Sequence, residues 1–200
     1  AGADDSSVFN GSYTGFEFLN ISNALGANNL DIDALNDVSK VTIVGNANGG
    51  TISNMNSGGT IHQTIDNTGT LTVAMDGAVV GNSDVLNLTF TQQTNAIVAG
   101  TLVAANVETI TIDATDSGTT KQDAAISTMT LQATSATSVT VTGNNGLNLT
   151  NTGNVKITNF DASAIAAAST TVSAGTAATT DSAANLAVTF ASANNTADAA

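Results

Sequence analysis

Apolar and polar residues alternate through the central part of the chain. An apolar side chain is followed by a polar one in residues 107–113, 129–133, 138–142, 147–150 and 155–158. Alternation of this kind places the two sets of side chains on opposite faces of a pleated strand. We therefore predict five short strands, each with one buried face and one face in contact with solvent.

The same pattern extends on both sides of this region. Apolar pairs separated by one polar residue recur roughly every ten residues, in residues 16–22, 30–33, 41–44, 61–65, 71–75, 86–90, 97–103 and 186–190. Segments rich in Gly and Asn, such as 45–50 and 143–146, lie between them. Both residue types tolerate the positive φ of tight corners. The chain is thus predicted to be a series of short strands joined by turns.

Two all-β architectures fit such a series, a right-handed parallel β-solenoid (β-helix) and a β-sandwich of short strands. The solenoid is favoured because small residues fill the space between apolar pairs. In addition, outward Thr and Asn side chains can form ladders of hydrogen bonds in a parallel stack. The segment at Leu147 is also followed by a similar one at Val155, a period of eight that suits one side of a coil. Uneven spacing elsewhere keeps the sandwich open as the alternative.

The predicted organisation has three parts. Residues 1–15 read as a connector, residues 16–165 as the β-solenoid domain, and residues 166–200 as an Ala/Thr/Ser-rich strand and tail. We expect the tail to continue into a region absent from this sequence. Clustered alanines in residues 123–131 and 161–168 suggest helix, and Asp161 or Ser163 would cap a short helix in the second cluster. A loop there is the alternative.

Composition excludes several classes of function. Sixteen acidic residues against three lysines give a net charge of −13, which disfavours nucleic acids and anionic membrane surfaces. The chain has no cysteine for disulfides or thiolate chemistry. No apolar run approaches the roughly 20 residues that a membrane-spanning helix needs.

Catalytic signals are also sparse. His62 is the only histidine and falls on the polar face of a predicted strand, where we expect a solvated surface residue. A polysaccharide-active β-helix enzyme would need paired carboxylates and, in most glycan sites, an aromatic platform, yet the chain has one Tyr and no Trp. We therefore expect that the protein is not an enzyme.

The acidic residues carry the clearest chemical signal. Carboxylates and carbonyls at turns are the hard oxygen ligands that calcium selects, with six to eight ligands per ion. The chain has neither an EF-hand loop nor the Gly-Gly-x-Gly-x-Asp nonapeptide of calcium-binding β-rolls. The alternative is that the acids solvate the surface and oppose aggregation. We predict calcium as the cofactor, with candidate ligands Asp31, Asp33, Asp37, Asp113, Asp116 and Asp161.

The exact amino-acid sequences of several segments carry a further signal. These segments are residues 15–23 (GFEFLNISN), 107–116 (VETITIDATD), 130–136, 139–144, 146–154 (GLNLTNTGN) and 159–163. They resemble bacterial surface-layer (S-layer) proteins of the Caulobacter type, an RTX-like family exported by type I secretion. The clearer similarity covers about residues 100–165, and a looser one extends back to residue 16.

The resemblance implies a structural, self-assembling subunit of a calcium-dependent lattice on a Gram-negative cell surface. Its partners would be further copies of itself, and lipopolysaccharide or a surface glycan bound through regions not present here. Calcium ligands cannot be transferred residue by residue, because the family's nonapeptide is missing from this sequence. The alternative function is an extracellular adhesin or stalk-like binding module.

Overall fold

The computed structural model describes residues 15–35, 38–45, 49–80, 83–92, 96–117, 126–165 and 187–192. Within them, fourteen strands form two parallel sheets of seven strands each. The only helical element in these ranges is the 3-10 turn η1 (Asp33–Leu35). No helix in the described part of the chain is long and apolar enough to cross a bilayer.

Odd-numbered and even-numbered strands form separate sheets. The first sheet contains β1 (Phe18–Ile21), β3 (Lys40–Ile43), β5 (Thr60–Gln63), β7 (Val85–Gln92), β9 (Thr109–Asp116), β11 (Ser138–Gly143) and β13 (Asn159–Ile165). The second contains β2 (Asn29–Asp31), β4 (Thr51–Met55), β6 (Thr70–Met75), β8 (Val98–Val103), β10 (Ser127–Gln132), β12 (Leu147–Asn151) and β14 (Val188–Ser192).

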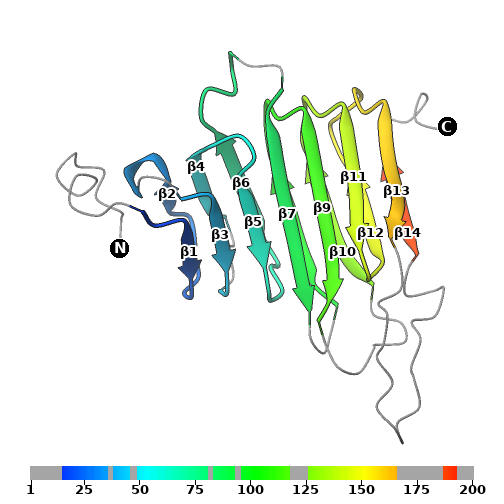
Figure 1. Cartoon of the computed structure of the whole chain (residues 1–200), viewed down its shortest axis with the longest axis horizontal. Helices are drawn as coiled ribbons and strands as arrows, with labels where there is room; N and C mark the ends of the chain where they lie inside the picture. The colour runs from blue at the N-terminus through cyan, green and yellow to red at the C-terminus, as the bar shows by residue number, and fades with distance from the viewer. Residues whose placement is uncertain are drawn as a thin grey trace, which may run out of the picture.

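Each odd strand and the even strand that follows it make one coil, and every coil stacks on the previous one (Figure 1). Pairing is parallel in both sheets, and among the described strands none pairs with its neighbour in sequence. This connectivity is that of a parallel β-solenoid, as predicted. The alternative of a sandwich built from hairpins is wrong, since hairpins would pair consecutive strands in antiparallel fashion.

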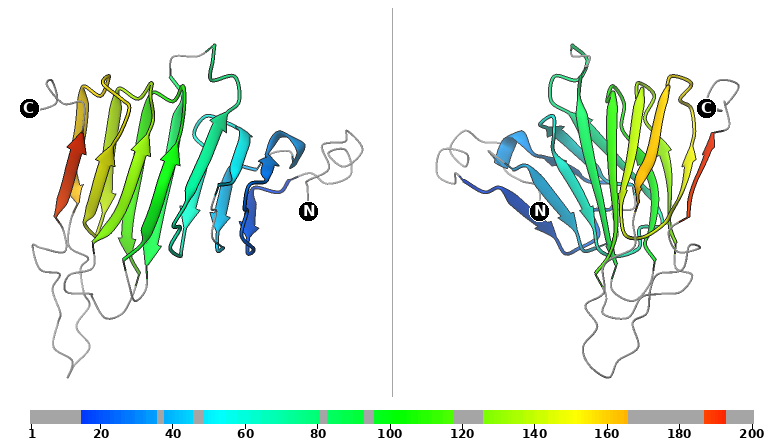
Figure 2. Two further views of the ribbon diagram at one scale, coloured as in Figure 1. Left: turned by 180° about the vertical axis from the view of Figure 1, so that it is seen from behind. Right: turned by 45° about the vertical axis from the view of Figure 1, so that its right-hand side comes forward.

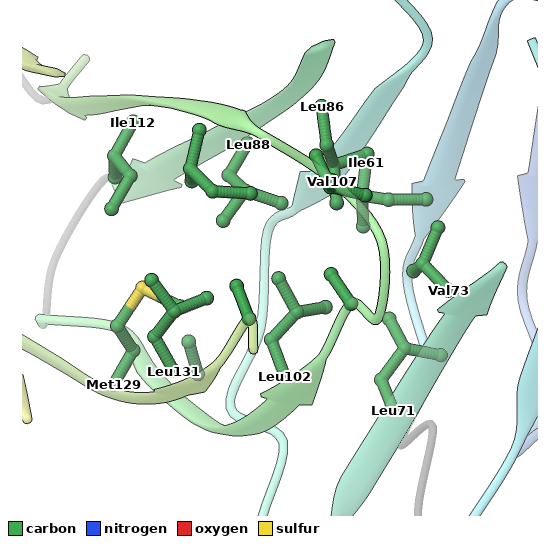
Figure 3. Packing of buried hydrophobic residues seen from close by; sticks show 14 of the residues in the cluster. Ile61, Leu71, Val73, Leu86, Leu88, Leu102, Val107, Ile112, Met129 and Leu131 are labelled. Atoms are coloured by element: carbon green, nitrogen blue, oxygen red, sulfur yellow. The ribbon is translucent and has the colours of Figure 1, made fainter. Parts of the chain in front are cut away.

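The two sheets lie face to face (Figure 2), and buried apolar residues from both sheets form one core cluster. Burial alternates residue by residue along β9, so that Ile110 and Ile112 point inward while Thr109 and Thr111 are only partly buried. Side chains of the first sheet face Leu102, Leu131 and their neighbours on the second sheet (Figure 3). Burying a side chain of this size contributes about 1.5–3 kcal/mol, so the stacked rows supply the main stabilisation.

Three sequence predictions are wrong in detail. The sequence pattern did not predict strand β4, because the apolar–polar alternation is interrupted there. In the structure, Asn54 adopts a φ of +57° at an irregularity in the ladder. Residues 155–158 form a corner instead of a strand, which also removes the proposed period of eight. The expected helices are strands where the structure describes them, namely β10 and β13; residues 123–125 and 166–168 lie outside the described ranges.

The boundary expected at residue 165 can also be placed against the structure. Strand β14 pairs with β12, with Leu149 beside Phe190, so the second sheet includes residues 188–192. The connector expected at residues 1–15 falls almost entirely outside the described ranges.

Gly143 allows two coils to approach closely at the end of β11. Its φ is +112°, and a Cβ atom there would overlap the carbonyl oxygen of Ala114 on β9. Gly153 also has a positive φ, of +73°, but a Cβ atom there would meet nothing within 4 Å.

We expect Gly143→Ala to lower the free energy of unfolding by more than about 2 kcal/mol, because backbone strain and overlap add. The matched variant Gly153→Ala should cost only about 1 kcal/mol, from strain alone. Urea unfolding followed by circular dichroism measures both. Equal costs would show that the two coils do not approach each other at Gly143 as described.

Candidate functional site

Polar side chains on the outer faces bond from one coil to the next. In the first sheet, the Thr111 hydroxyl donates to Asn87 Oδ1, and Asn159 Nδ2 donates to Ser138 Oγ at 3.0 Å. In the second, the Thr189 hydroxyl donates to Asn148 Oδ1 at 2.9 Å. The outward Thr and Asn residues therefore form ladders, mostly between unlike partners. These side chains hold neighbouring coils in register.

His62 belongs to this outer network. Its Nε2 lies 3.0 Å from the Thr91 hydroxyl and its Nδ1 lies 3.5 Å from the Thr42 hydroxyl. Partial burial lowers the pKa of the imidazole, the positive charge of Lys40 lowers it further, and Asp113 opposes both. His62 is thus partly buried and bridges coils, whereas the sequence predicted a solvated residue.

Asp31 and Asp33 lie together in the first coil. One carboxylate oxygen of Asp31, Oδ1, accepts hydrogen bonds from the Asp33 amide at 3.1 Å and from Asn54 Nδ2 at 2.9 Å. The first bond closes a local turn, and the second joins β2 to β4. Asp37, the third acid predicted for this cluster, lies outside the described residues.

Asp113 and Asp116 lie near the end of β9, in the fifth odd-numbered strand along the stack. The Thr115 hydroxyl donates to Asp113 Oδ1 at 2.6 Å. Asp116 is buried, and its backbone is held by the side chain of Asn144: Asn144 Oδ1 accepts from the Asp116 amide at 2.7 Å, while Asn144 Nδ2 donates to the Asp116 carbonyl at 3.1 Å. The Asn144 amide thereby continues the ladder beyond β11.

Asp161 lies on β13, in the last coil. Its Oδ1 accepts a hydrogen bond from the Ser163 amide at 2.9 Å, and the Ser163 side chain also bonds to it. These two bonds, the side-chain bond first, hold the pKa of the exposed Asp161 carboxyl below its ordinary value. They coincide with an irregularity in the pairing of β11 with β13.

The described candidate ligands therefore occupy three separate places. Asp113 pairs across the ladder with Thr142, whereas Asp161 pairs with Thr140, so the two acids differ in both coil and row. The Asp31 pair belongs to the first coil of the stack. In the described ranges, no three Asp, Glu or His side chains gather closely enough to hold a metal ion. The assignment of calcium to these residues remains a prediction.

The two end coils show a feature that the sequence reasoning missed. The apolar residues that pack against the core but are only partly buried all belong to the two end coils. In the first coil and the turn after it they are Leu19, Ile21, Leu25, Leu30 and Leu35, and in the last coil they are Phe160, Ala162, Ile165, Val188 and Phe190. Core residues of the intervening coils are at most 7% exposed. Both ends of the stack therefore leave part of the core uncovered.

The two ends differ in shape. A hollow of about 370 Å³ is formed by β1, β2 and the turn between them, and its lining mixes apolar residues such as Leu19, Leu25 and Leu30 with polar ones such as Asn20 and Asn28. At the other end, Phe160 of β13 stacks on Phe190 of β14, with ring centroids 4.4 Å apart and an interplanar angle of 13°. The phenylalanine positions were a usable signal, since four of the six lie at the ends: Phe16, Phe18, Phe160 and Phe190.

A shallow polar groove crosses the corners that lead from the second sheet back to the first. It measures about 390 Å³ and carries one charge of each sign, Glu108 and Lys156, with Asn106, Ser135 and Thr137 between them. Val79, at 86% exposure, stands at its border.

The sequence matches no protein-family model and has no significant match among curated proteins. The resemblance to S-layer proteins therefore remains a hypothesis about function.

Because His62 is the only histidine, its titration can be followed by NMR without assignment of other rings. Its pKa should lie below the usual value of about 6.5. Asp113→Asn should lower that pKa further, and Lys40→Gln should raise it, whereas the control Asp161→Asn should leave it unchanged.

The lowered pKa also predicts a pH dependence of stability. The unfolded chain takes up the proton at a higher pH than the folded chain does, so the free energy of unfolding should fall as the pH drops through about 6.5. The fall should level off below the folded pKa. A His62 pKa at or above the usual value would contradict the described packing of the ring.

Proposed function

We propose that this chain is a structural, non-enzymatic subunit of a bacterial surface layer. It assembles with further copies of itself, in a calcium-dependent manner, on the surface of a Gram-negative cell after type I secretion. The resemblance of residues 100–165 to S-layer proteins supports the cellular context. The parallel β-solenoid supports the structural role, since it is the fold that this resemblance implies.

The observation that carries the proposal is the incomplete covering of the core at both ends of the stack. Parallel stacks of coils need capping at their ends, because an uncapped coil exposes both apolar core and unpaired strand edges. Here the partly covered apolar residues concentrate on the two end coils. Burial of these residues against a further molecule supplies a driving force for self-association.

Charge supplies the proposed control. At a net charge of −13, copies of the chain repel one another. Asp31, Asp33 and Asp161 lie in the end coils, so an approach of two ends brings carboxylates together. Divalent cations neutralise such groups and can complete their coordination with carbonyls or with acids of a second copy. Assembly should therefore begin when calcium is added.

A binding module of adhesin type is the second candidate, and the groove beside Glu108 and Lys156 is the observation that favours it. A module of this kind would act as a monomer that presents the groove to a polar ligand. Glycan-array binding that is lost in Lys156→Ala, by a protein that stays monomeric in calcium, would favour this function over a surface layer.

For the surface-layer function, the expected result is a growth in particle size when calcium is added to purified protein. Light scattering should detect the growth, and electron micrographs should show ordered sheets or filaments. A chelator should disperse them. Magnesium at the same concentration is the control, since it prefers to retain its water ligands and bridges carboxylates less readily.

A protein that remains monomeric across a wide range of protein and calcium concentrations would overturn the proposal. Assembly that is unaffected by the chelator would remove the role of calcium and leave the structural function.

A further inference from the structure

We infer that the two ends of the solenoid bind each other, so that copies stack head to tail into a filament of continuous coils. The inference rests on the proposed self-assembly and specifies which surfaces meet. The last coil, with β13 and β14, would lie on the first coil of the next copy, with β1 and β2. The partner is a second copy of this same chain.

Direction is the first argument. All described strand pairs are parallel, so the stack has one edge formed by β1 and β2 and an opposite edge formed by β13 and β14 (Figure 1). Strand β13 pairs with one edge of β11, and the corresponding edge of β13 itself points away from the stack. Strand β1 of a second copy could pair with that edge in the same parallel direction in which β1 pairs with β3. Unlike ends can therefore continue the existing ladder, whereas like ends cannot.

Shape is the second argument. The first coil offers a hollow of about 370 Å³, in which Leu19, Leu25 and Leu30 form an apolar part beside polar Asn and Ser side chains. The last coil offers the stacked pair of Phe160 and Phe190, which reaches across from one sheet to the other. Flat apolar rings can cover the apolar part of this hollow, whereas two like ends would bring one pair of rings against another and leave both hollows empty. Buried aromatic residues are also common anchors of protein interfaces.

A second apolar surface continues the first coil outward. Phe16 and Phe18 are 53% and 65% exposed, and with Leu19, Leu35 and Val38 they line a further hollow of about 190 Å³. Aromatic residues are rare in this chain, at 4% of the sequence. Their presence at both ends therefore sets the ends apart from the Thr- and Asn-rich faces between them.

Charged residues on the edge strands determine when two ends can approach each other. Asp161 on β13 and Asp31 on β2 place a carboxylate at each end, and a charge on an edge strand opposes pairing with another chain. Strand β14 has no charged residue within Val188–Ser192. Contact through β14 should thus be favoured over β13, and cations should be needed to offset the repulsion between ends.

Heterologous contacts between unlike ends form a closed ring or an open filament, depending on the rotation between copies. Here each added copy would continue the parallel ladder along the stack, which gives an open filament. Stacking predicts an open filament, and in a surface layer it predicts that one lattice direction follows the solenoid axis.

The absence of cysteine from the chain allows a direct test. Asn29→Cys places a thiol on β2 in the first coil, and Ala191→Cys places one on β14 in the last; both positions are exposed. In calcium, a short bis-maleimide should join an equal mixture of the two variants into dimers and stop there. Either variant alone should remain monomeric, while the double variant should give a ladder of oligomers.

Two further variants complete the test. Ala74→Cys, on an exposed site of β6 in the middle of the second sheet, is the control and should not react with either end. Phe16→Ser/Phe18→Ser should reduce the cross-linking of the mixed ends by about tenfold or more, as expected for the loss of an aromatic anchor. Circular dichroism of this variant checks that the coils stay folded.

The outcomes separate this inference from the proposed function. Cross-linking of like ends, or of Ala74→Cys at the same yield as the end positions, would overturn head-to-tail stacking. If wild-type protein forms calcium-dependent assemblies and the mixed ends still do not react, the surface-layer proposal stands and the stacking inference falls. If wild-type protein never assembles, both fall.

Discussion

Parallel pairing between successive coils is the constraint on which the rest of this structure depends. Because each strand bonds to the strands two places before and after it in sequence, every inward residue is held above its equivalent in the next coil. Neighbouring strands lie about 4.8 Å apart, which leaves room for small or branched apolar residues in continuous rows. The same spacing brings outward side chains within hydrogen-bonding reach, as between Thr189 and Asn148.

This constraint also explains where function can arise. A coil in the middle of the stack has both its edges paired and its apolar residues covered, so it contributes rigidity. The two end coils have one edge each without a partner strand among the described residues. They also carry Phe16, Phe18, Phe160 and Phe190. Under the proposed function, identical copies would meet at these surfaces, and the acids at the ends would make that contact sensitive to cations.

The sequence predicted the fold class because strict alternation, as in β9 and β11, reports which face of a strand is buried. The same alternation was misleading where a corner, and not a strand, carries it. Val155 and Ile157 alternate like strand residues, yet buried Asn154 bonds to the carbonyls of Ala133 and Ala136 and fixes that segment as a corner. The six candidate acids could be chosen from the sequence by residue type alone. The distances between acids depend on the number of residues in each coil and on strand register, and the uneven spacing of the strands hides both in the sequence.

Hydrogen exchange of the monomer, in dilute solution with a chelator, tests the account of an open-ended stack most directly. Protection of backbone amides should be greatest in β7 and β9, which are paired on both sides and lie in the middle of the first sheet, and should decline toward β1 and β2 at one end and β13 and β14 at the other. Protection in these end strands equal to that of β9 would contradict the account, because it would show that the ends are already covered.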